Sequence, residues 1–215
     1  MFGVPVIDYD KETERVRRIY DKRARLTAPP RADEGCRWLC SQASGDVLEI
    51  GIGRGRTLPY YPRAIKLAAI ELSEVCAEAA ARRARELGIA AAIRIGDATA
   101  LPYPDQHFDT IVFCHSLCTI PDDRRAMSEA VRVLRPGGRL LALEHVRSPN
   151  PIVRAVLHVL EPLECWRMGD HLLREPADLV LAEGLEIETL ERLALGLIER
   201  LAARKPELEE LEQAV

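Results

Sequence analysis

The sequence has few aromatic residues, no long apolar run and little net charge. Aromatic side chains make up 5% of the 215 residues, which counts against a base-stacking platform for nucleic acid. Thirty Lys and Arg face 34 Asp and Glu, and this net charge of −4 also counts against a nucleic-acid partner. No transmembrane segment or signal peptide is expected, because no run of about 18 apolar residues and no basic, apolar N-terminus occur. These absences predict a cytoplasmic protein with a single globular domain over residues 1–215.

The six cysteines do not have the spacing of a metal site. Two pairs, Cys36/Cys40 and Cys114/Cys118, are four residues apart, which can place both thiols on one face of a helix. Neither a CxxC nor an HxxxH pattern accompanies them, so we predict no metal. We expect reduced, mostly buried thiols, as is usual without a secretory context.

Strands and helices alternate through the middle of the chain. Ser73 and either Asp122 or Asp123 are the expected N-caps of the two helices in this region, and Pro136-Gly137-Gly138 is expected to end the second helix. The alternation predicts an α/β fold with a largely parallel sheet and helices on both faces. The predicted strands are 46–51, 66–71, 91–95, 108–114 and 139–146.

The flanking segments are mostly helical in pattern. The segment 11–25 combines seven basic and three acidic residues with apolar residues at helical spacing. It fits a solvated helix that packs onto the domain, and less well a helix that touches anionic lipid. Asp33 is a plausible N-cap for the next helix. Further helices are expected at 33–44, 151–167 and 175–184, a strand at 185–191, a propensity-based helix at 193–204 and a helical or frayed tail at 206–215.

A glycine-rich turn follows the first strand. In LEIGIGRGRT, Gly51, Gly53 and Gly55 permit unusual backbone angles and close approach of a ligand to the main chain. Ligands of open parallel sheets bind at this edge, beyond the carboxyl ends of the strands. A dinucleotide fingerprint needs glycine at position 56, where this chain has Arg56, so a nicotinamide oxidoreductase is disfavoured.

Three carboxylates accompany this turn. Glu71 ends the second strand and can accept hydrogen bonds from two ribose hydroxyls. Asp97, after the third strand, can accept from an exocyclic adenine amine, and Glu49 suits a ligand ammonium. Together they predict a ligand with an adenosine end and a cationic, zwitterionic end, and they would repel a pyrophosphate.

These segments resemble the class I S-adenosylmethionine-dependent methyltransferases. The resemblance rests on VLEIGIGRG, Glu71, GDATALPYPDQHFDTIVF and VLRPGGRLLALEH, which together cover about residues 46–146. It implies a Rossmann-like α/β fold whose seven-stranded sheet is mostly parallel, with helices on both faces and the last strand antiparallel. It also implies that residues 196–206 form this final strand, against their helical propensity. The implied parts are a helical lid at 1–45, a cofactor-binding core at 46–146, an acceptor-side region at 147–205 and a tail at 206–215.

The same resemblance assigns roles in binding S-adenosylmethionine. The three glycines would line its methionine part, Glu71 would hold the ribose, and Asp97 with Ala98 would hold the adenine. His115 would lie beside the transferable methyl group, and Tyr20 would fold over the cofactor. The full predicted set is Tyr20, Glu49, Gly51, Gly53, Gly55, Glu71, Leu72, Asp97, Ala98 and His115.

The methyl acceptor is less well defined by the sequence. FCHSLCTIPD follows the fourth strand in place of the NPPY type that binds planar amines, which disfavours nucleic-acid methylation. LPYYP, CHSLCTIPD, LEHVRSPN and DHLLREP are similar to animal thiol S-methyltransferases and soluble bacterial phosphatidylethanolamine N-methyltransferases, and more loosely to quinone C-methyltransferases of the type 11 group. We expect a small-molecule methyltransferase with a thiol or other apolar acceptor. The alternatives are phospholipid-amine or quinone methylation, for which peripheral membrane contact is conceivable, and a non-catalytic S-adenosylmethionine-binding protein.

Histidine is the expected proton acceptor, because an imidazole ordinarily titrates near neutral pH. The candidates are His115, His145 and His171. An apolar acceptor site is expected from Trp166, Met168, His171 and Leu172, with Asp170 and Arg174 as an alternative internal pair. The oligomeric state is left open by the sequence.

Overall fold

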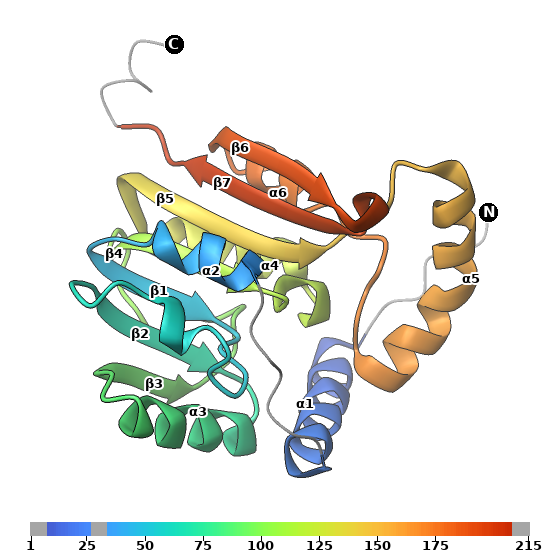
Figure 1. The fold of residues 1–215 in the computed structure, drawn as a ribbon. Coiled ribbons are helices and arrows are strands. Elements are labelled where there is room, and N and C mark those ends of the chain that lie inside the picture. The colour runs from blue at the N-terminus through green and yellow to red at the C-terminus, as the bar shows by residue number, and fades with distance from the viewer. Residues whose placement is uncertain (1–7, 27–33, 208–215) are drawn as a thin grey trace.

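The computed structural model describes residues 8–26 and 34–207, and shows a seven-stranded sheet in the order β3-β2-β1-β4-β5-β7-β6 (Figure 1). Strand β7 runs antiparallel to both of its neighbours, and the first five strands are parallel to one another. This arrangement confirms the predicted fold class. The strands are β1 Asp46–Ile50, β2 Lys66–Glu71, β3 Ala91–Ile95, β4 Phe108–Cys114, β5 Leu134–His145, β6 Glu186–Leu193 and β7 Ile198–Arg204.

In the described part of the chain, six α-helices connect or flank these strands. Two predicted caps are confirmed: the Ser73 hydroxyl accepts from the Cys76 amide, and, of the candidates Asp122 and Asp123, the Asp122 carboxylate accepts from the Arg125 amide. Asp33, the other predicted cap, lies outside the described residues. The helices are α1 Tyr9–Leu26, α2 Glu34–Ser41, α3 Glu74–Glu86, α4 Asp123–Val133, α5 Pro151–Met168 and α6 Pro176–Ala182, with 3-10 turns η1 Leu58–Tyr60, η2 Leu117–Thr119 and η3 Ala194–Gly196.

The sheet separates two apolar cores. On one face, Leu39 of α2 and Ala80 of α3 pack with Val47 and Val112. On the other face, residues of α4 and α6 pack against the alternate side chains of β1, β4 and β5. Because both faces are covered, the central strands are apolar at nearly every position, which is why the sequence showed them as continuous runs.

Two element boundaries differ from the simplest sequence pattern. Helix α4 ends at Val133 and β5 begins at Leu134, before the Pro-Gly-Gly sequence that was expected to separate them. Proline disfavours helical angles at the residue before it, here Arg135, so the chain is already extended when it reaches Pro136. Residues 198–204 form a strand although they favour a helix, because Leu201 and Ala203 are fully buried between β5 and β6. The tail from residue 208 lies outside the described part.

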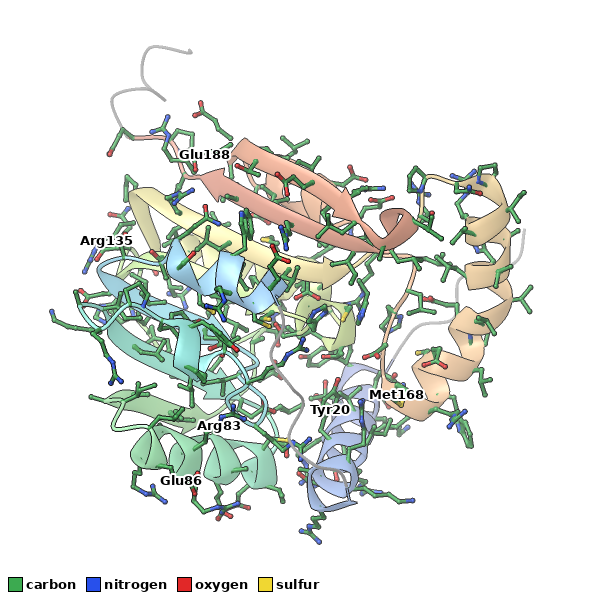
Figure 2. All side chains as sticks on the ribbon, in the orientation of Figure 1. Tyr20, Arg83, Glu86, Arg135, Met168 and Glu188 are labelled. Atoms are coloured by element: carbon green, nitrogen blue, oxygen red, sulfur yellow. The ribbon has the colours of Figure 1, made fainter. Side chains whose placement is uncertain are left out.

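Helix α1 lies beyond the carboxyl ends of the central parallel strands (Figure 1). Helix α5 stands beside α1, away from the sheet, and its last residue, Met168, lies next to α1 (Figure 2). Among the described residues of the predicted lid segment, α1 takes this position and α2 does not, since α2 packs against β4 and β5.

Candidate functional site

A cavity of about 430 Å³ lies between α1 and the carboxyl ends of the parallel strands. Its position is the one predicted, at the edge where strand order reverses around β1. Glu49 and Gly55 do not line it. Eight of the ten predicted cofactor residues do: Tyr20, Gly51, Gly53, Glu71, Leu72, Asp97, Ala98 and His115.

Two glycines of the turn after β1 serve different purposes. Gly51 has φ of +75°, and a Cβ there would lie 2.6 Å from the Cβ of Ser116, so this position brings the turn against the loop after β4. Gly53 has φ of +57°, and a Cβ there would meet no atom within 4 Å. The main chain at Gly53 is therefore open toward the cavity, as a bound ligand requires.

Gly55 and Glu49 support the turn from inside the protein. A Cβ at Gly55 would lie 2.5 Å from Leu58 Cδ1. The Glu49 carboxylate is 1% exposed and accepts hydrogen bonds from Thr57 Oγ1 at 2.8 Å and Tyr61 Oη at 3.0 Å. Burial raises the pKa of Glu49 to about 7, although both hydrogen bonds oppose the shift. Glu49 thus fixes the loop that carries the glycines.

Glu71 presents a buried carboxylate at the end of β2. It accepts from the Gly53 amide at 2.8 Å and from the Ser73 amide at 2.9 Å. Burial raises the pKa of Glu71, and the backbone hydrogen bonds oppose that rise. Each carboxylate oxygen keeps a further lone pair, so the group can also accept from ligand hydroxyls.

Asp97 connects the loop after β3 to α1. Its carboxylate accepts from Tyr9 Oη at 2.9 Å and from the Thr99 amide at 2.8 Å. Both Asp97 and Tyr9 line the cavity. The tyrosine therefore closes α1 over the position where the resemblance places the adenine.

One face of α1 covers the cavity. Tyr20 was the one predicted cofactor residue on this helix. The other lining residues lie three or four positions apart along the same face, and this spacing is the signal that predicts them. The lining residues of α1 are Tyr9, Thr13, Val16, Arg17, Tyr20 and Arg23.

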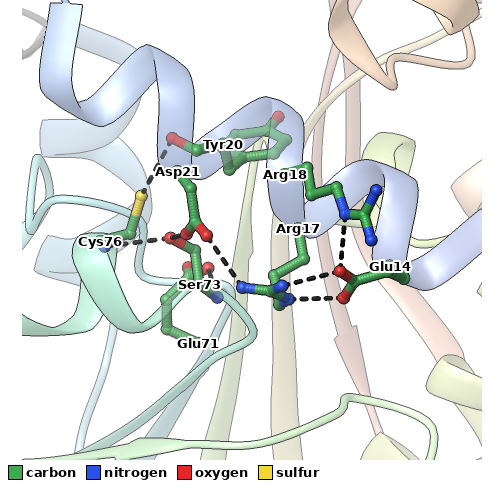
Figure 3. A network of polar contacts seen from close by, with 8 residues as sticks. All are labelled: Glu14, Arg17, Arg18, Tyr20, Asp21, Glu71, Ser73 and Cys76. Carbon is green, nitrogen blue, oxygen red and sulfur yellow. Dashed lines mark hydrogen bonds and ion pairs between the residues drawn. The ribbon is translucent and has the colours of Figure 1, made fainter.

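A polar network fastens α1 to the cofactor side of the cavity (Figure 3). The Ser73 hydroxyl donates to Asp21 Oδ1 at 2.6 Å, and Arg17 Nη1 lies 2.9 Å from Asp21 Oδ2. The Ser73 amide in turn donates to Glu71. The position of α1 is thereby coupled to the buried carboxylate.

Two of the three candidate histidines meet at the cavity. The rings of His115 and His145 lie 4.6 Å apart between centroids, tilted by 39°, and both line the cavity. His115 has φ of +51°, a conformation rare outside glycine, and its amide donates to the Leu143 carbonyl. His171 does not line the cavity, and its Nδ1 lies 3.5 Å from a Glu161 oxygen.

The acceptor-side region contributes less than expected. Trp166 is 70% exposed, and Trp166, Met168 and Leu172 are not among the residues that line the cavity. From residues 147–205, Asp170 and Ile198 do line it. The predicted pairing of Asp170 with Arg174 is wrong, because Arg174 Nε contacts Asp123 at 3.2 Å and its guanidinium donates to the Leu117 carbonyl.

Charge around the cavity is mixed. The cavity carboxylates Glu71 and Asp97 were predicted as cofactor residues, but four arginines that also line the cavity were not. Two of these arginines alternate with the glycines of the turn. Carboxylates and guanidinium groups together suit a zwitterionic ligand. The arginines are Arg17, Arg23, Arg54 and Arg56.

The cysteines are thiols. None of the six, all of which fall in the described part, forms a disulfide, although Cys36 Sγ and Cys114 Sγ lie 3.6 Å apart. Within residues 8–26 and 34–207, no group of three or more His, Cys, Asp or Glu is placed to hold a metal ion.

Comparison with known proteins agrees with this geometry. Residues 48–142 match the family described as "Methyltransferase domain". The chain is 31% identical over 139 residues to phosphatidylethanolamine N-methyltransferase of Cereibacter sphaeroides, covering 62% of this chain and 68% of that one. It is 39% identical over 123 residues to the ubiquinone/menaquinone biosynthesis C-methyltransferase UbiE of Dinoroseobacter shibae, covering 53% of this chain and about half of that relative (48%).

Solved structures share the fold. Geranyl diphosphate C-methyltransferase of Streptomyces coelicolor A3(2), solved with S-adenosyl-L-homocysteine, superposes with a TM-score of 0.71 at 15% identity, over 94% of this chain and 100% of that one. A sheet of this topology, a glycine turn with buried acidic partners, and relatives of this similarity point to one family. The chain belongs to the S-adenosylmethionine-dependent methyltransferases.

Proposed function

We propose that this methyltransferase acts on a small, largely apolar acceptor whose nucleophile is a thiol or a phenolic or quinol group. The observation that carries the proposal is the His115–His145 pair at the cavity, with ring centroids 4.6 Å apart. A neutral imidazole takes a proton at ordinary pH, which a thiol or phenol must lose and an uncharged amine need not.

The residues at the cavity fit the cofactor. Glu71 has lone pairs available for the ribose hydroxyls, Asp97 can accept from the adenine amine, and Gly53 leaves its main chain open. Arg54 and Arg56 border the same turn and suit the cofactor carboxylate. When bound, S-adenosylmethionine supplies an electrophilic methyl carbon on a sulfonium, so the protein chiefly has to align the acceptor and receive its proton.

His145 is the better placed of the two histidines to receive that proton. Its Nδ1 lies 3.8 Å from Cys118 Sγ, which leaves Nε2 for the acceptor. His115, held in its positive φ after β4, would orient the acceptor against this ring.

A second candidate is a phospholipid amine, and Asp170 favours it. This half-buried carboxylate lines the cavity, and burial raises its pKa against the opposing charge of Arg23. A carboxylate there would pair with an ammonium acceptor and receive the proton that its nitrogen must lose before it attacks the methyl carbon. The Cereibacter relative is named for such an acceptor.

Two substitutions separate these candidates in a labelled-methyl transfer screen over thiols, phenols, quinols and phosphatidylethanolamine. For a thiol, phenol or quinol, His145→Gln should lower kcat by about 100-fold with little change in KM for S-adenosylmethionine. For an amine, Asp170→Asn should instead raise KM for the acceptor. His107→Gln, at an exposed position outside the cavity, is the matched control.

The screen also tests methyl transfer itself. If no acceptor gains label while S-adenosylhomocysteine still binds, a binding protein without transfer activity replaces the proposal. If His145→Gln transfers methyl at the wild-type rate to a phenol or thiol, the histidine has no part in proton removal.

A further inference from the structure

Helix α5 carries an apolar stripe that residues 8–26 and 34–207, the described part of the chain, leave exposed. Only one residue of this 18-residue helix, Leu157, is buried. Two of the exposed positions, Ile152 and Val159, are 76% and 78% exposed. At 3.6 residues per turn the exposed apolar residues fall within an arc of about 120°. They are Ile152, Val156, Val159, Leu160, Leu163 and Trp166.

The stripe belongs to a well-formed helix. Asn150 caps its start by accepting from the amides of Ile152 and Val153, and Gly169 ends it with φ of +76°. The acidic residues Glu161 and Glu164 project about 100° or more from the centre of the stripe. Large apolar surfaces that remain exposed on a capped helix mark a site of interaction.

Helix α1, in contrast to α5, presents a charged surface that is rich in basic residues. It holds seven basic and four acidic side chains, in a chain whose net charge is −4. Its cavity-lining residues occupy one face, and five of its cations fall on the opposite face at helical spacing, three of them in ion pairs with Asp8, Glu12 and Glu14. These are Lys11, Arg15, Arg18, Lys22 and Arg25.

The basic face of α1 and the apolar stripe of α5 are adjoining surfaces. Arg15 Nη1 donates to the carbonyl oxygens of Cys165 at 2.8 Å and Trp166 at 3.1 Å. Gly169, directly after α5, packs against Val16 of α1, where a Cβ would lie 3.4 Å from Val16 Cγ2. Val16 lines the cavity, so the combined surface borders the cavity cover.

We propose that α5 and the outer face of α1 form a docking surface for an anionic lipid bilayer. In this arrangement α5 lies in the plane of the interface with its apolar stripe among the acyl chains, while the cations of α1 contact lipid phosphates. Trp166, at the junction of the two helices, is a residue type that favours this boundary. No helix of the described chain is long and apolar enough to cross the bilayer. Binding of this surface to the bilayer does not depend on which acceptor the enzyme methylates. Docking would place the edge of the cavity close to an apolar acceptor dissolved in the bilayer.

Flotation with vesicles tests this proposal without measuring methyl transfer. The full chain should float with vesicles of phosphatidylcholine containing about one quarter phosphatidylglycerol, and binding should weaken as salt rises. Ile152→Ser with Val159→Ser should reduce the vesicle-bound fraction at least tenfold, the loss expected from removing buried apolar side chains. Arg18→Gln with Lys22→Gln should weaken binding by about 25-fold at low salt, at about fivefold for each charge.

Matched control variants show whether loss of binding is specific to the α1 and α5 surface or follows from removing any exposed apolar or basic side chains. Leu181→Ser with Leu190→Ser removes exposed apolar side chains elsewhere, and Arg82→Gln with Arg85→Gln removes two exposed charges from α3. Both should float as the wild type does. In a Trp38→Phe variant, the emission of Trp166 should shift to shorter wavelength on binding and be quenched by brominated lipid.

Three results would overturn the proposal. They are absence of flotation with anionic vesicles, flotation that the α5 and control variants share equally, and a dimer in sedimentation that Ile152→Ser with Val159→Ser abolishes. The last result would assign the stripe to a second copy of the chain. A protein that floats but transfers no methyl would leave the docking surface standing and contradict the proposed function alone.

Discussion

The hydroxyl of Tyr9 donates to the carboxylate of Asp97 at 2.9 Å, although the two residues are 88 positions apart in the sequence. This contact joins α1 to the loop after β3 over the cavity. We expect Tyr9→Phe to weaken binding of S-adenosylhomocysteine by about fivefold to tenfold, because one hydrogen bond to a charged group is lost. Calorimetry against Tyr60→Phe, a tyrosine outside the cavity, measures the effect. Equal affinities of the two variants for S-adenosylhomocysteine would show that this hydrogen bond does not hold α1 over the cavity.

Glu71 should contribute more to cofactor binding than any exposed carboxylate of α3. Glu71→Ala is expected to cost about 1–3 kcal/mol of binding free energy, the range for losing charged hydrogen bonds. The control is Glu78→Ala, an exposed position on α3. Glu71 also accepts from the Gly53 and Ser73 amides, so the melting temperature of each variant is measured as well. Glu71→Gln distinguishes the effect of losing the charge from the effect of disordering the glycine loop. An unchanged affinity in a folded Glu71→Ala variant would contradict the ribose-binding role.

Gly51→Ala and Gly53→Ala should fail in different ways. Both residues have positive φ, which costs an alanine about 1–2 kcal/mol. At Gly51 the new methyl also meets Ser116 at 2.6 Å, so the free energy of unfolding should fall by more than that strain alone. At Gly53 the methyl meets no protein atom within 4 Å, so the free energy of unfolding should fall only by the backbone strain. Cofactor affinity should fall more in Gly53→Ala than in Gly51→Ala, because the methyl at position 53 extends into the space left open for the ligand. Urea unfolding and calorimetry on the two variants check this, and equal losses of stability would be inconsistent with it.

Glu49 should make the fold less stable as pH rises. Burial raises its pKa in the folded protein to about 7 from an ordinary 4.5, so the folded state holds its proton more tightly than the unfolded state. Its stabilising effect is complete below the unfolded value and is lost as pH rises through about 7, by up to about 3 kcal/mol.

Glu49→Gln removes this titration and keeps the shape of the side chain. Urea midpoints measured at about pH 5 and about pH 8 should differ less in the variant than in the wild type. The exposed Glu78→Gln variant should keep the wild-type pH dependence. A wild-type slope in Glu49→Gln would mean that another group carries the effect.

Local sequence patterns were enough to predict the core of this protein. Strands 66–71, 91–95 and 108–114 were predicted with the bounds that the structure shows. For 108–114 the reason is that a central strand covered on both faces needs a short continuous apolar run. The cap Ser73 was predicted, and the second cap was narrowed to Asp122 or Asp123, because a cap acts on amides two or three residues away in the same local segment. The glycine turn and the carboxylates at the ends of β2 and β3 follow from local spacing and from the rule that parallel strands end at one edge.

Which residues complete the site depends on tertiary contacts that no local pattern contains. Tyr9 reaches Asp97, His145 meets His115 and Asp170 enters the cavity because distant segments pack together, and no local pattern records those distances. The same packing turned Glu49 inward beneath the turn and left the apolar face of α5 outside the core, where its periodicity alone would have predicted burial. Hydrophobic spacing shows that a face must be covered, and the topology decides whether protein or another surface covers it.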